Sequence, residues 1–501
     1  MINSLLIFIS ILWLIVFAKK LLFWTYLWQL KEYHIGRFID HFQTYKGRRL
    51  ILNWWLSLEL LVLLGIYLSA KLVWLGIKIN LVYIAIFIFF IEGALFLRNV
   101  HRGTYKKPVI TRKTAIILTT GVSLGVLLVF SLFVLEFSLT KFVFPLLFLD
   151  AFAPIFFSIL ILAFQPMTVI LRNRILASAT KKRAEFKKLL VIGVTGSYAK
   201  TSTKEYLAAI LSEKFNVLKT REHQNSEVGI SQCVLDELTA NHEIFIVEMG
   251  AYNRGGIKLL CDIVNPKIGV LTGINEQHMA TFGSQENIIK AKYELIESLP
   301  ADGAAFFNGH NQYCRNLFEK TLRRGSGRAK LYGQDAGSSY EENLAGAVAV
   351  AEFLGMNPEA IERGIQKIKQ SQISRIKKGA NGVDIIDSTY SANPSGVIAD
   401  LDYLTLRFPQ GKKIIVMPCL IELGQASQEV HRRIGKKIGE VCDLAIITTK
   451  DRLREIREGA PDALFMERAD EIAEKIKSFS KSGDVVLLES RVPNQIIKRL
   501  I

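Results

Sequence analysis

The residues best placed to do chemistry lie in the segment VIGVTGSYAKTSTKEYLAAIL at 191–211. An apolar strand pattern leads into a glycine-containing turn, and the turn leads into a helix that opens with hydroxyl residues. This layout directs backbone N–H groups and a helix N-terminus at phosphate. Lys200 would reach the β- and γ-phosphates of a nucleotide, and the Thr201 hydroxyl would reach Mg²⁺. The candidate nucleotide loop comprises Gly193, Thr195, Gly196, Ser197, Tyr198, Ala199, Lys200, Thr201 and Ser202.

One residue of this loop departs from the strict GxxxxGK[ST] spacing, because Ala199 stands where such loops carry glycine. Glycine-rich turns between a strand and a helix also occur without any ligand, so the loop alone leaves both interpretations open. We expect the alanine to be tolerated if its φ is negative, or if the loop has room for one methyl group away from phosphate.

Charge is divided unevenly along the 501-residue chain. Half of the residues are hydrophobic and the mean hydropathy is +0.25, which is too apolar for an ordinary soluble enzyme. Residues 1–190 hold 23 Lys and Arg against seven Asp and Glu, whereas the remainder is nearly balanced. The basic excess therefore belongs to the hydrophobic part, as is typical of membrane-flanking loops. A nucleic-acid partner is not expected for the balanced second part.

Five apolar stretches are long enough, or nearly so, to cross a hydrocarbon core of about 30 Å. They lie at about 3–28, 50–72, 78–97, 114–136 and 142–165. Lys19 and Lys20 interrupt the first stretch, so its second part could lie in the membrane interface instead. The sequence predicts a transmembrane region of about five helices over 1–170 and a basic juxtamembrane linker over 171–189.

The basic residues fall in alternate loops. Residues 29–49, 98–113 and 172–188 carry five, six and seven Lys or Arg, whereas the loops between them offer little beyond Lys78 and Lys141. The positive-inside rule then places the N-terminus outside and everything after residue 166 in the cytoplasm. Four spans, with the first stretch in the interface, would fit only with the N-terminus inside.

Two further features of this region suggest more than packing. Segment 27–42 mixes apolar and basic residues at roughly helical spacing, which favours a helix along the inner membrane surface over a plain loop. Glu59, Glu92 and Asp150 fall inside apolar stretches, where a carboxyl group is costly. Each contacts a polar headgroup or a buried partner, or else is a protonated or interfacial side chain that only packs helix against helix. For Glu92, near the inner end of its stretch, packing alone is favoured.

After residue 189 the pattern changes to alternating strands and helices, which is typical of parallel sheets with helices on their faces. A first run includes LLVIGVTG, EIFIVEMGA and PKIGVLTGI, and a second includes GVDIIDSTY, KKIIVMPCL, LAIITT and GDVVLLES. The sequence therefore predicts two α/β domains, 190–373 and 374–501. Five scattered cysteines without a CxxC pair fit reduced cytosolic thiols.

Short motifs follow the nucleotide loop in a fixed order. They are HQNSEVGIS at 223–231, VEMGA at 247–251, NEQHMATFGS at 275–284, KAKYEL at 290–295, NGHN at 308–311, IDSTYSANP at 386–394 and IELG at 421–424. Together with the loop they resemble the Mur ligases, which make peptidoglycan peptides with ATP, and most closely the members that add D-alanyl-D-alanine. The resemblance covers about 190–501. It implies a central P-loop ATPase domain, a Rossmann-like C-terminal domain and a bacterial plasma (inner) membrane location for the anchored chain.

The resemblance also assigns roles to individual residues. Mur ligases convert a carboxylate to an acyl phosphate that an amine then attacks, so cations must hold several anions together. It implies that Glu248 and His278 are ligands of Mg²⁺ or Mn²⁺ beside Thr201, and that carbamylated Lys292 meets the same metal. Expected catalytic residues are Lys200, Glu248, His278, Lys292 and Arg375; further ATP contacts are Asn308, Asn311, Asn343 and Asp387; expected substrate contacts are Asn225, Ser226, Tyr390, Asn393 and Pro394.

The chain departs from the family pattern in its C-terminal part. Ser388 and Ser391 replace an aspartate and an asparagine of the family's D-D-S-Y-N-A-N-P stretch, and Leu488 replaces the lysine of a K-G-S-R segment. These changes leave the exact contacts to the nucleotide and the amine open. Ala199 departs by only one methyl group. Because its surroundings are equipped for ATP, we expect a working nucleotide site.

The leading hypothesis is a membrane-anchored, ATP-dependent amide ligase that joins a dipeptide such as D-Ala-D-Ala to a muramyl peptide. A second is a Mur-like ligase acting on another envelope polymer, such as poly-γ-glutamate, or on an amidated lipid intermediate. The lipid-amidating ligases usually carry a four-cysteine zinc insertion, and the sequence has none. A third is a non-catalytic membrane scaffold that senses nucleotide or precursor.

The acceptor is a separate question. Soluble enzymes of this type begin with a small domain that holds the uridine diphosphate of the substrate, and apolar stretches occupy that place here. Lys and Arg at the inner membrane surface suit an anionic polyprenyl-pyrophosphate-linked muropeptide, and anchoring raises the effective concentration of enzyme and substrate. The alternative is simple tethering of an enzyme that uses the UDP-linked acceptor.

Overall fold

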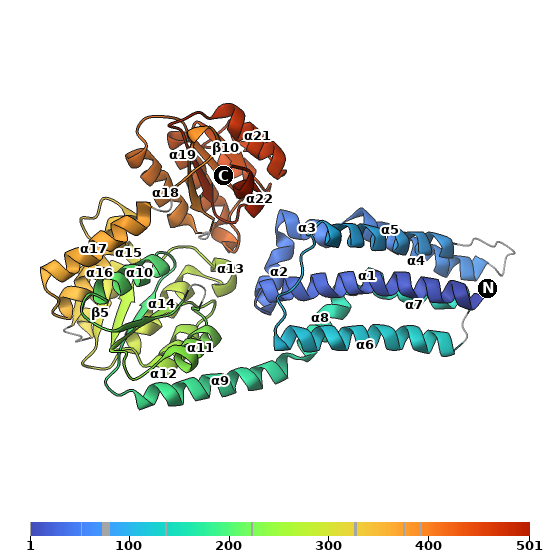
Figure 1. The fold of residues 1–501 in the computed structure, drawn as a ribbon, viewed down its shortest axis with the longest axis horizontal. Coiled ribbons are helices and arrows are strands. Elements are labelled where there is room, and N and C mark those ends of the chain that lie inside the picture. Colours follow the sequence, from blue (N-terminus) through green and yellow to red (C-terminus); the bar gives the residue numbers. More distant parts are fainter. Residues whose placement is uncertain are drawn as a thin grey trace. The chain divides into compact units, whose positions relative to one another are not determined.

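The computed structural model describes residues 2–51, 53–72, 81–135, 138–221, 224–324, 328–373, 376–389 and 393–500. Arg375 and Tyr390, two of the predicted site residues, lie outside these ranges. The chain divides into two compact units, Met1–Leu171 and Arg172–Ile501 (Figure 1). Its five cysteines are all free.

The first unit consists of apolar helices, as long runs of Leu, Ile, Val and Phe predict. They are α1 (Ile2–Leu30), α2 (Ile35–Gln43), α3 (Tyr45–Ile51), α4 (Trp54–Leu72), α5 (Val82–His101), α6 (Arg112–Val134), α7 (Leu139–Ala151) and α8 (Ala153–Ala163). Glycines on α6 allow close packing against α1: a Cβ at Gly121 would lie 2.8 Å from the Leu21 side chain, and one at Gly125 would lie 2.8 Å from the Phe17 ring. Small residues at such contacts are common between membrane helices.

Four helices within the described ranges are long and apolar enough to cross a membrane, judged by length and composition alone. They are Asn3–Leu30, Tyr45–Ser69, Val82–His101 and Arg112–Val134. Helices α7 and α8 meet at 71° and would add a fifth span if they form one bent element. The predicted apolar stretches thus coincide with helices, and their crossing of a membrane stays a prediction.

The structure adds two details to the first unit. Lys19 and Lys20 lie within one continuous helix, α1 (Ile2–Leu30), so the interrupted apolar stretch is a single helix, and the membrane depth of its second part stays a prediction. Segment 27–42 is mostly helical but is divided between α1 and α2, and its position at a membrane surface also stays a prediction. Glu32 and Tyr33 have φ of 54° and 58°, and this left-handed turn separates α1 from α2.

The second unit contains two six-stranded sheets. The first is entirely parallel, in the order β2-β3-β1-β4-β5-β6. Its strands are β1 (Leu190–Thr195), β2 (Val217–Lys219), β3 (Ile244–Met249), β4 (Ile268–Leu271), β5 (Ala304–Asn308) and β6 (Ala329–Tyr332). Its helices are α10 (Lys200–Leu211), α11 (Glu227–Glu237), α12 (Gly256–Val264), α13 (Met279–Phe282), α14 (Gln285–Glu297), α15 (Gln312–Arg323), α16 (Ser339–Phe353) and α17 (Pro358–Ile373).

Helices cover both faces of this sheet. Side chains of α10, α16 and α17 form one core with Ile192, Val194 and Ile246. Side chains of α11, α12, α14 and α15 form another with the alternate positions Val191 and Val247. Both faces are therefore buried, which explains the nearly continuous apolar runs of β1 and β3. Helix α9 (Gln165–Glu185) also contributes to the second core, so much of the predicted basic linker is helical.

The second sheet has the order β11-β10-β9-β12-β8-β7, parallel except for the antiparallel pair β7 and β8. Its strands are β7 (Ile376–Lys378), β8 (Asp384–Ser388), β9 (Lys413–Met417), β10 (Leu444–Ile447), β11 (Leu464–Phe465) and β12 (Val485–Glu489). Its helices are α18 (Pro394–Arg407), α19 (Ser427–Val441), α20 (Leu453–Arg457), α21 (Ala469–Phe479) and α22 (Asn494–Leu500). The predicted α/β fold class is confirmed.

The order of the first sheet determines where a site can form. Strand β1 lies between β3 and β4. The strands β2 and β3, which follow β1 in the chain, lie on one side of it, and β4, β5 and β6 lie on the other, so the strand order reverses next to β1. Ligands bind beyond the carboxyl ends of parallel strands at such a reversal. The predicted loop follows β1, Glu248 lies at the end of β3, and Asn308 ends β5.

Candidate active site

Gly196, in the loop after β1, has no room for a side chain. A Cβ at Gly196 would lie 2.1 Å from Thr272 Oγ1 and 2.9 Å from the Gly273 carbonyl, so only glycine fits. The Ser197 N–H donates to the Gly273 carbonyl at 2.7 Å, and the Thr272 hydroxyl donates to the Tyr198 carbonyl at 2.5 Å. The segment after β4 therefore holds the loop in shape.

Ala199 does not have the negative φ that would have explained the missing glycine. Its φ is 62° and its ψ is 0°, in the left-handed region. This conformation costs an L-residue about 1–2 kcal/mol relative to the right-handed one. Ala199 is the N-cap of α10, so its methyl group is accommodated at the start of the helix in a strained backbone conformation.

Lys200 is the first residue of α10. Its Nζ donates to the Gly196 carbonyl at 2.9 Å and lies 3.4 Å from the Ser197 carbonyl, so the side chain folds over the loop. Burial lowers the pKa of Lys200, and the negative charge of Glu248 opposes that shift. The amine is thus positioned where it can exchange carbonyl oxygens for phosphate oxygens.

Glu248 is 3% exposed and has a defined partner on each oxygen. Thr201 Oγ1 donates to Oε2 at 2.9 Å, and Asn225 Nδ2 donates to Oε1 at 3.0 Å. The Glu248 N–H donates to Thr220 Oγ1 at 3.0 Å, which fixes the end of β3. Asn225 orients the carboxylate in this structure, and its predicted contact with substrate stays a prediction.

Lys204 is a residue of this site that the sequence reasoning missed. Its side chain is completely buried, and its Nζ lies 3.4 Å from Glu248 Oε2 and 3.3 Å from Glu205 Oε1. A buried ammonium this close compensates part of the buried carboxylate charge. The signal was available, because Lys204 follows Lys200 at the i,i+4 spacing that places both on one face of a helix.

His278 precedes the short helix α13 and has a φ of 64°. Its Nδ1 lies 2.7 Å from Glu422 Oε2, and the Tyr252 ring packs edge-on against it at 4.9 Å. Burial lowers the pKa of His278, as do Lys292 and Lys200, while Glu422 raises it. A neutral imidazole that donates its Nδ1 proton to a carboxylate leaves the Nε2 lone pair for a metal. Glu422, in the quoted IELG motif, was not assigned this orienting role.

Three polar contacts join the loop after β4 to the C-terminal domain. Besides the pair of His278 and Glu422, Asn275 Nδ2 donates to Ser395 Oγ at 2.8 Å. Arg433 meets both oxygens of Glu276 at 3.3 Å. The two α/β domains thus meet at the residues that border the candidate site.

Lys292 projects from α14 and is 2% exposed. Its Nζ lies 5.7 Å from the centre of the Phe282 ring. Burial, helped by the charge of Lys200 and opposed by Glu294, lowers the pKa of Lys292 to about 7. A substantial fraction of the amine is therefore unprotonated at neutral pH, and only the unprotonated amine can react with carbon dioxide.

The predicted adenine-site asparagines have internal partners. Asn308 Nδ2 donates to the Thr272 carbonyl and to Glu342 Oε2, both at 2.8 Å. Asn311 Nδ2 donates to the Ile274 carbonyl at 3.0 Å and lies 3.3 Å from the Tyr198 hydroxyl. Both therefore support the loop after β4, whatever they contact in a nucleotide. Asn343 is buried on α16.

The remaining predicted residues lie near the ends of secondary-structure elements. Asp387 is the last residue but one of β8 and accepts a hydrogen bond from the Thr389 hydroxyl at 2.7 Å. Asn393 caps α18 by accepting the Gly396 N–H at 2.8 Å, and Pro394 is the first helical residue. Ser226 caps α11. These side chains have local structural roles, which do not exclude contact with substrate.

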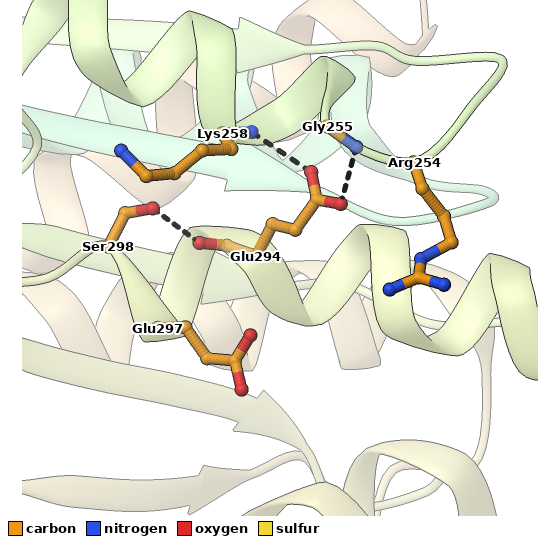
Figure 2. Close-up of a pocket in the computed structure, with 6 residues that line it drawn as sticks. All are labelled: Arg254, Gly255, Lys258, Glu294, Glu297 and Ser298. Carbon is orange, nitrogen blue, oxygen red and sulfur yellow. Dashed lines mark hydrogen bonds between the residues drawn. The ribbon is translucent and has the colours of Figure 1, made fainter.

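A surface hollow of about 510 Å³ is lined by none of the predicted site residues. Figure 2 shows the residues that line it. Its lining residues are Arg254, Gly255, Lys258, Glu294, Glu297 and Ser298. The Glu294 carboxylate accepts the N–H groups of Gly255 at 2.6 Å and Lys258 at 3.0 Å, so it caps the start of α12. This contact anchors α14, which carries Lys292, against α12.

The arrangement suits a nucleotide triphosphate and a hard divalent cation. The loop, Glu248, His278 and Asn308 lie at or just beyond the ends of the neighbouring strands β1, β3, β4 and β5. The Thr201 hydroxyl and the Glu248 carboxylate supply adjacent oxygen donors of the kind that Mg²⁺ prefers. The loop that contains Gly196, at the N-terminus of α10, offers backbone N–H groups to the phosphates.

Two family models match the second unit. The Mur ligase middle domain matches residues 194–358, and the Mur ligase glutamate ligase domain matches residues 372–491. The chain is 32% identical over 273 residues to a UDP-N-acetylmuramoyl-tripeptide–D-alanyl-D-alanine ligase of Synechocystis sp., covering 50% of this chain and 59% of the relative. It is 29% identical over 332 residues to the ligase of the same name from Bacillus subtilis, covering 60% of this chain and 72% of the relative.

Solved structures support the fold. MurF of Thermotoga maritima in complex with ADP superposes with a TM-score of 0.56 at 24% identity, over 66% of this chain and 83% of that one. MurF of Acinetobacter baumannii gives 0.54 at 24% identity, over 64% and 78%. The chain spans about three fifths of the Synechocystis relative's length. Through its middle and C-terminal domains the chain belongs to the Mur ligase family and is homologous to the MurF ligases.

Proposed function

We propose that the chain is an ATP-dependent amide ligase that joins a muramyl-peptide carboxylate to an amine such as D-Ala-D-Ala. The observation that carries the proposal is the buried Glu248 carboxylate, which meets the Thr201 hydroxyl beside a glycine-containing phosphate cradle. Two lysines compensate the charge of this carboxylate. Lys204 Nζ lies 3.4 Å from Glu248 Oε2, and Lys200 interacts electrostatically with Glu248. The names of the MurF relatives support the substrate class.

The proposed reaction has two steps. A carboxylate oxygen of the acceptor attacks the γ-phosphorus of ATP, and ADP leaves. The amine nitrogen then attacks the acyl carbon, loses a proton, and releases phosphate that carries the former carboxylate oxygen. Because the anionic acceptor carboxylate must approach the anionic phosphates of ATP, positioning and charge neutralisation supply most of the catalysis.

Residues of this chain supply those functions. The loop N–H groups and Lys200 bind the phosphates, with Lys200 turning from the Gly196 and Ser197 carbonyls toward them. Thr201, Glu248, His278 and a carbamylated Lys292 would hold Mg²⁺ or Mn²⁺, and the cation would supply positive charge to neutralise the anionic reactants. The lowered pKa of Lys292 supports carbamylation, since the amine must be neutral to add carbon dioxide.

The C-terminal domain completes the proposed site. By resemblance, Arg375 binds ATP phosphates, Asp387 contacts the nucleotide, and Tyr390, Asn393 and Pro394 contact the amine substrate. Asn275 and His278 contact Ser395 and Glu422 of the C-terminal domain. These contacts support the role, because they bring the C-terminal domain next to the proposed nucleotide site.

The apolar first unit suggests where the reaction takes place. We place α1, α4, α5, α6 and the pair α7–α8 across the bacterial plasma membrane, with the N-terminus outside and the second unit in the cytoplasm. Four candidate spans and the alternation of basic loops support this placement. A membrane-bound enzyme would meet a polyprenyl-pyrophosphate-linked muropeptide directly, and this is the acceptor that we favour.

The test is ADP release by the full chain in nanodiscs, with UDP-linked and lipid-linked muramyl peptides and a panel of amines. We expect turnover that requires both a muramyl acceptor and a D-Ala-D-Ala-like amine, and its loss in Glu248→Gln. Turnover with a different amine or polymer would indicate a ligase of another envelope component. Nucleotide binding without amine-dependent ADP release under any combination would indicate a sensor.

The acceptor is decided by comparing kcat/KM for the two muramyl peptides in the same nanodiscs. A higher value for the lipid-linked peptide is expected. Equal or better turnover of the UDP-linked peptide would contradict a lipid-linked acceptor while leaving the ligase proposal intact.

A further inference from the structure

Four helices of the first unit bring ionisable side chains together in its interior. Lys20 comes from α1, Glu59 from α4, Glu92 from α5 and Asp150 from α7. Lys20 Nζ lies 3.1 Å from Glu59 Oε1, 2.8 Å from Asp150 Oδ1 and 3.7 Å from Glu92 Oε2. Lys19 Nζ adds a contact of 3.3 Å to Glu92 Oε2. The sequence indicated three separate costly carboxyl groups, whereas the fold makes them one cluster.

The charges of this cluster do not balance. The side chains of Glu59, Glu92 and Asp150 are 3%, 5% and 1% exposed, so all three carboxyl groups are buried. Lys19 and Lys20 are the lysines in contact with them within the described part of the bundle. With every group ionised, one negative charge would remain buried without compensation, which costs several kcal/mol. The cluster therefore requires one additional positive charge.

One buried oxygen atom shows where that charge would be held. Asp150 Oδ2 accepts no hydrogen bond from the residues that the structure describes. Glu92 Oε2 accepts none either, but it faces the ammonium groups of Lys19 at 3.3 Å and Lys20 at 3.7 Å. Carboxylate oxygens of the three residues lie within 4.8 Å of one another. An oxygen-only donor set of this kind suits a proton or a hard cation. Because Lys19 and Lys20 already offset two of the three negative charges, a monovalent cation gives neutrality and a divalent cation does not.

We propose that Glu59, Glu92 and Asp150, arranged around Lys20, bind one exchangeable monovalent cation, either Na⁺ or a proton. Lys19, whose side chain is 28% exposed, marks the accessible side of the cluster. Occupancy would hold α4, α5 and α7 against α1, so the packing of the bundle would depend on the cation. This site is independent of the nucleotide site, and neither proposal depends on the other.

The chain offers a specific readout for this unit. All six tryptophans lie in the first 74 residues, so tryptophan fluorescence follows unfolding of the first unit alone. The full chain in nanodiscs of uncharged lipid is heated in Na⁺ or choline buffers between pH 6 and pH 8. A cation that binds the folded bundle preferentially raises the unfolding midpoint, by roughly 2–5 °C at saturation. Retention of ²²Na⁺ in equilibrium dialysis measures the stoichiometry.

Retention of one Na⁺ per chain at pH 8, with a higher midpoint in Na⁺, would identify Na⁺ as the ligand. A midpoint that rises as the pH falls, without Na⁺ retention, would identify the proton. Asp150→Asn balances the charges and should abolish either response, as should Glu59→Gln, while Asp40→Asn on α2 should keep it. A wild-type midpoint that ignores both Na⁺ and pH, or a response unchanged in Asp150→Asn and Glu59→Gln, would overturn the proposal.

Discussion

Ala199 and His278 both lie in the left-handed region of backbone space, and both border the candidate nucleotide site. Non-glycine residues in this region cost free energy, and such strain clusters where a site requires a particular backbone path. At Ala199 the required path is the turn into α10 that directs N–H groups at phosphate. At His278 it is the turn that presents the imidazole to Glu422. Strain at the two positions therefore accompanies the proposed chemistry.

Replacing Ala199 with glycine should stabilise the second unit. Relief of the left-handed strain gains about 1–2 kcal/mol, and the greater freedom of glycine in the unfolded chain returns about 0.4–1 kcal/mol. We expect a net gain of about 0–1.6 kcal/mol and no loss of ATP affinity, measured by calorimetric unfolding and by titration with ATP–Mg²⁺. Ala209→Gly, within α10, is the matched control and should cost about 1 kcal/mol. Equal destabilisation by both variants would contradict a strained Ala199.

Lys292 should make the stability of the second unit depend on pH. Its pKa is about 7 in the folded chain against an ordinary 10.5, so the unfolded chain binds more protons between these values. Stability then rises as the pH increases from about 7 toward 10. In carbon-dioxide-free buffer, calorimetry should show a midpoint that rises from pH 7 to pH 9 in the wild type and rises less in Lys292→Met.

The control for this measurement is Lys290→Met, on the same helix, where the exposed lysine pairs with Glu286. This variant should keep the wild-type pH dependence. If Lys292→Met keeps it as well, the amine is not held neutral by burial, and the physical support for carbamylation is removed.

At the scale of elements, the loop between β4 and α13 is the contact point of the two α/β domains. It supplies Asn275, Glu276 and His278, which meet Ser395, Arg433 and Glu422 of the C-terminal domain. The same loop neighbours Lys292 and the nucleotide loop. Association of the two domains and formation of the proposed metal site are thus coupled through one short segment.

Arg433→Ala should loosen this contact without unfolding either domain. The exposed pair of Arg433 and Glu276 is worth about 0.2–1 kcal/mol, so amide hydrogen exchange in 275–282 should accelerate about 1.5- to 5-fold. Arg432, its neighbour on α19, pairs with Glu458 inside the C-terminal domain, and Arg432→Ala should leave exchange in 275–282 unchanged. Equal acceleration in the two variants would show that the domain contact does not protect this loop.

The predictability of the elements follows from how locally each is encoded. The strands ending at Thr195 and Met249 are apolar runs buried on both faces, and their placement required no tertiary information. The loop between β1 and α10 follows from residue types alone. The φ of Ala199 could not be predicted, because it depends on the Thr272–Gly273 segment, which lies more than 70 residues away and fixes the loop from outside.

Side-chain contacts between segments far apart in the sequence could not be predicted either. Nothing near His278 indicates that Glu422 orients it, because the two meet only when the second sheet packs against the loop after β4. Lys20 had been interpreted as an interruption of an apolar stretch, yet it is the partner of Glu59 and Asp150 from two other helices. The motif predicts a substrate contact for Asn225, and it gave no sign that the Asn225 amide also donates to Glu248. Roles of Arg375 and Tyr390 stay predictions.

At the scale of the whole molecule, the chain combines an apolar helical unit with a Mur ligase unit, and the proposed orientation can be tested directly. All cysteines of the sequence lie at position 233 or later, so new cysteines in the first unit report without local background. In intact spheroplasts, a membrane-impermeant maleimide should label Ser138→Cys and should label Thr104→Cys only after permeabilisation. The reverse pattern would place the basic loops outside and contradict the cytoplasmic placement of the second unit.

The most direct test of the ligase account follows the oxygen atoms of the reaction. A muramyl-peptide acceptor with an ¹⁸O-labelled carboxylate is incubated with ATP, Mg²⁺, D-Ala-D-Ala and the full chain in nanodiscs. Attack of the carboxylate on the γ-phosphorus, followed by attack of the amine on the acyl carbon, must transfer one ¹⁸O to inorganic phosphate for each amide formed. We predict this transfer in the wild type, and neither product nor labelled phosphate in Glu248→Gln. Phosphate without ¹⁸O, or ATP bound but never consumed with acceptor and amine present, would contradict the account.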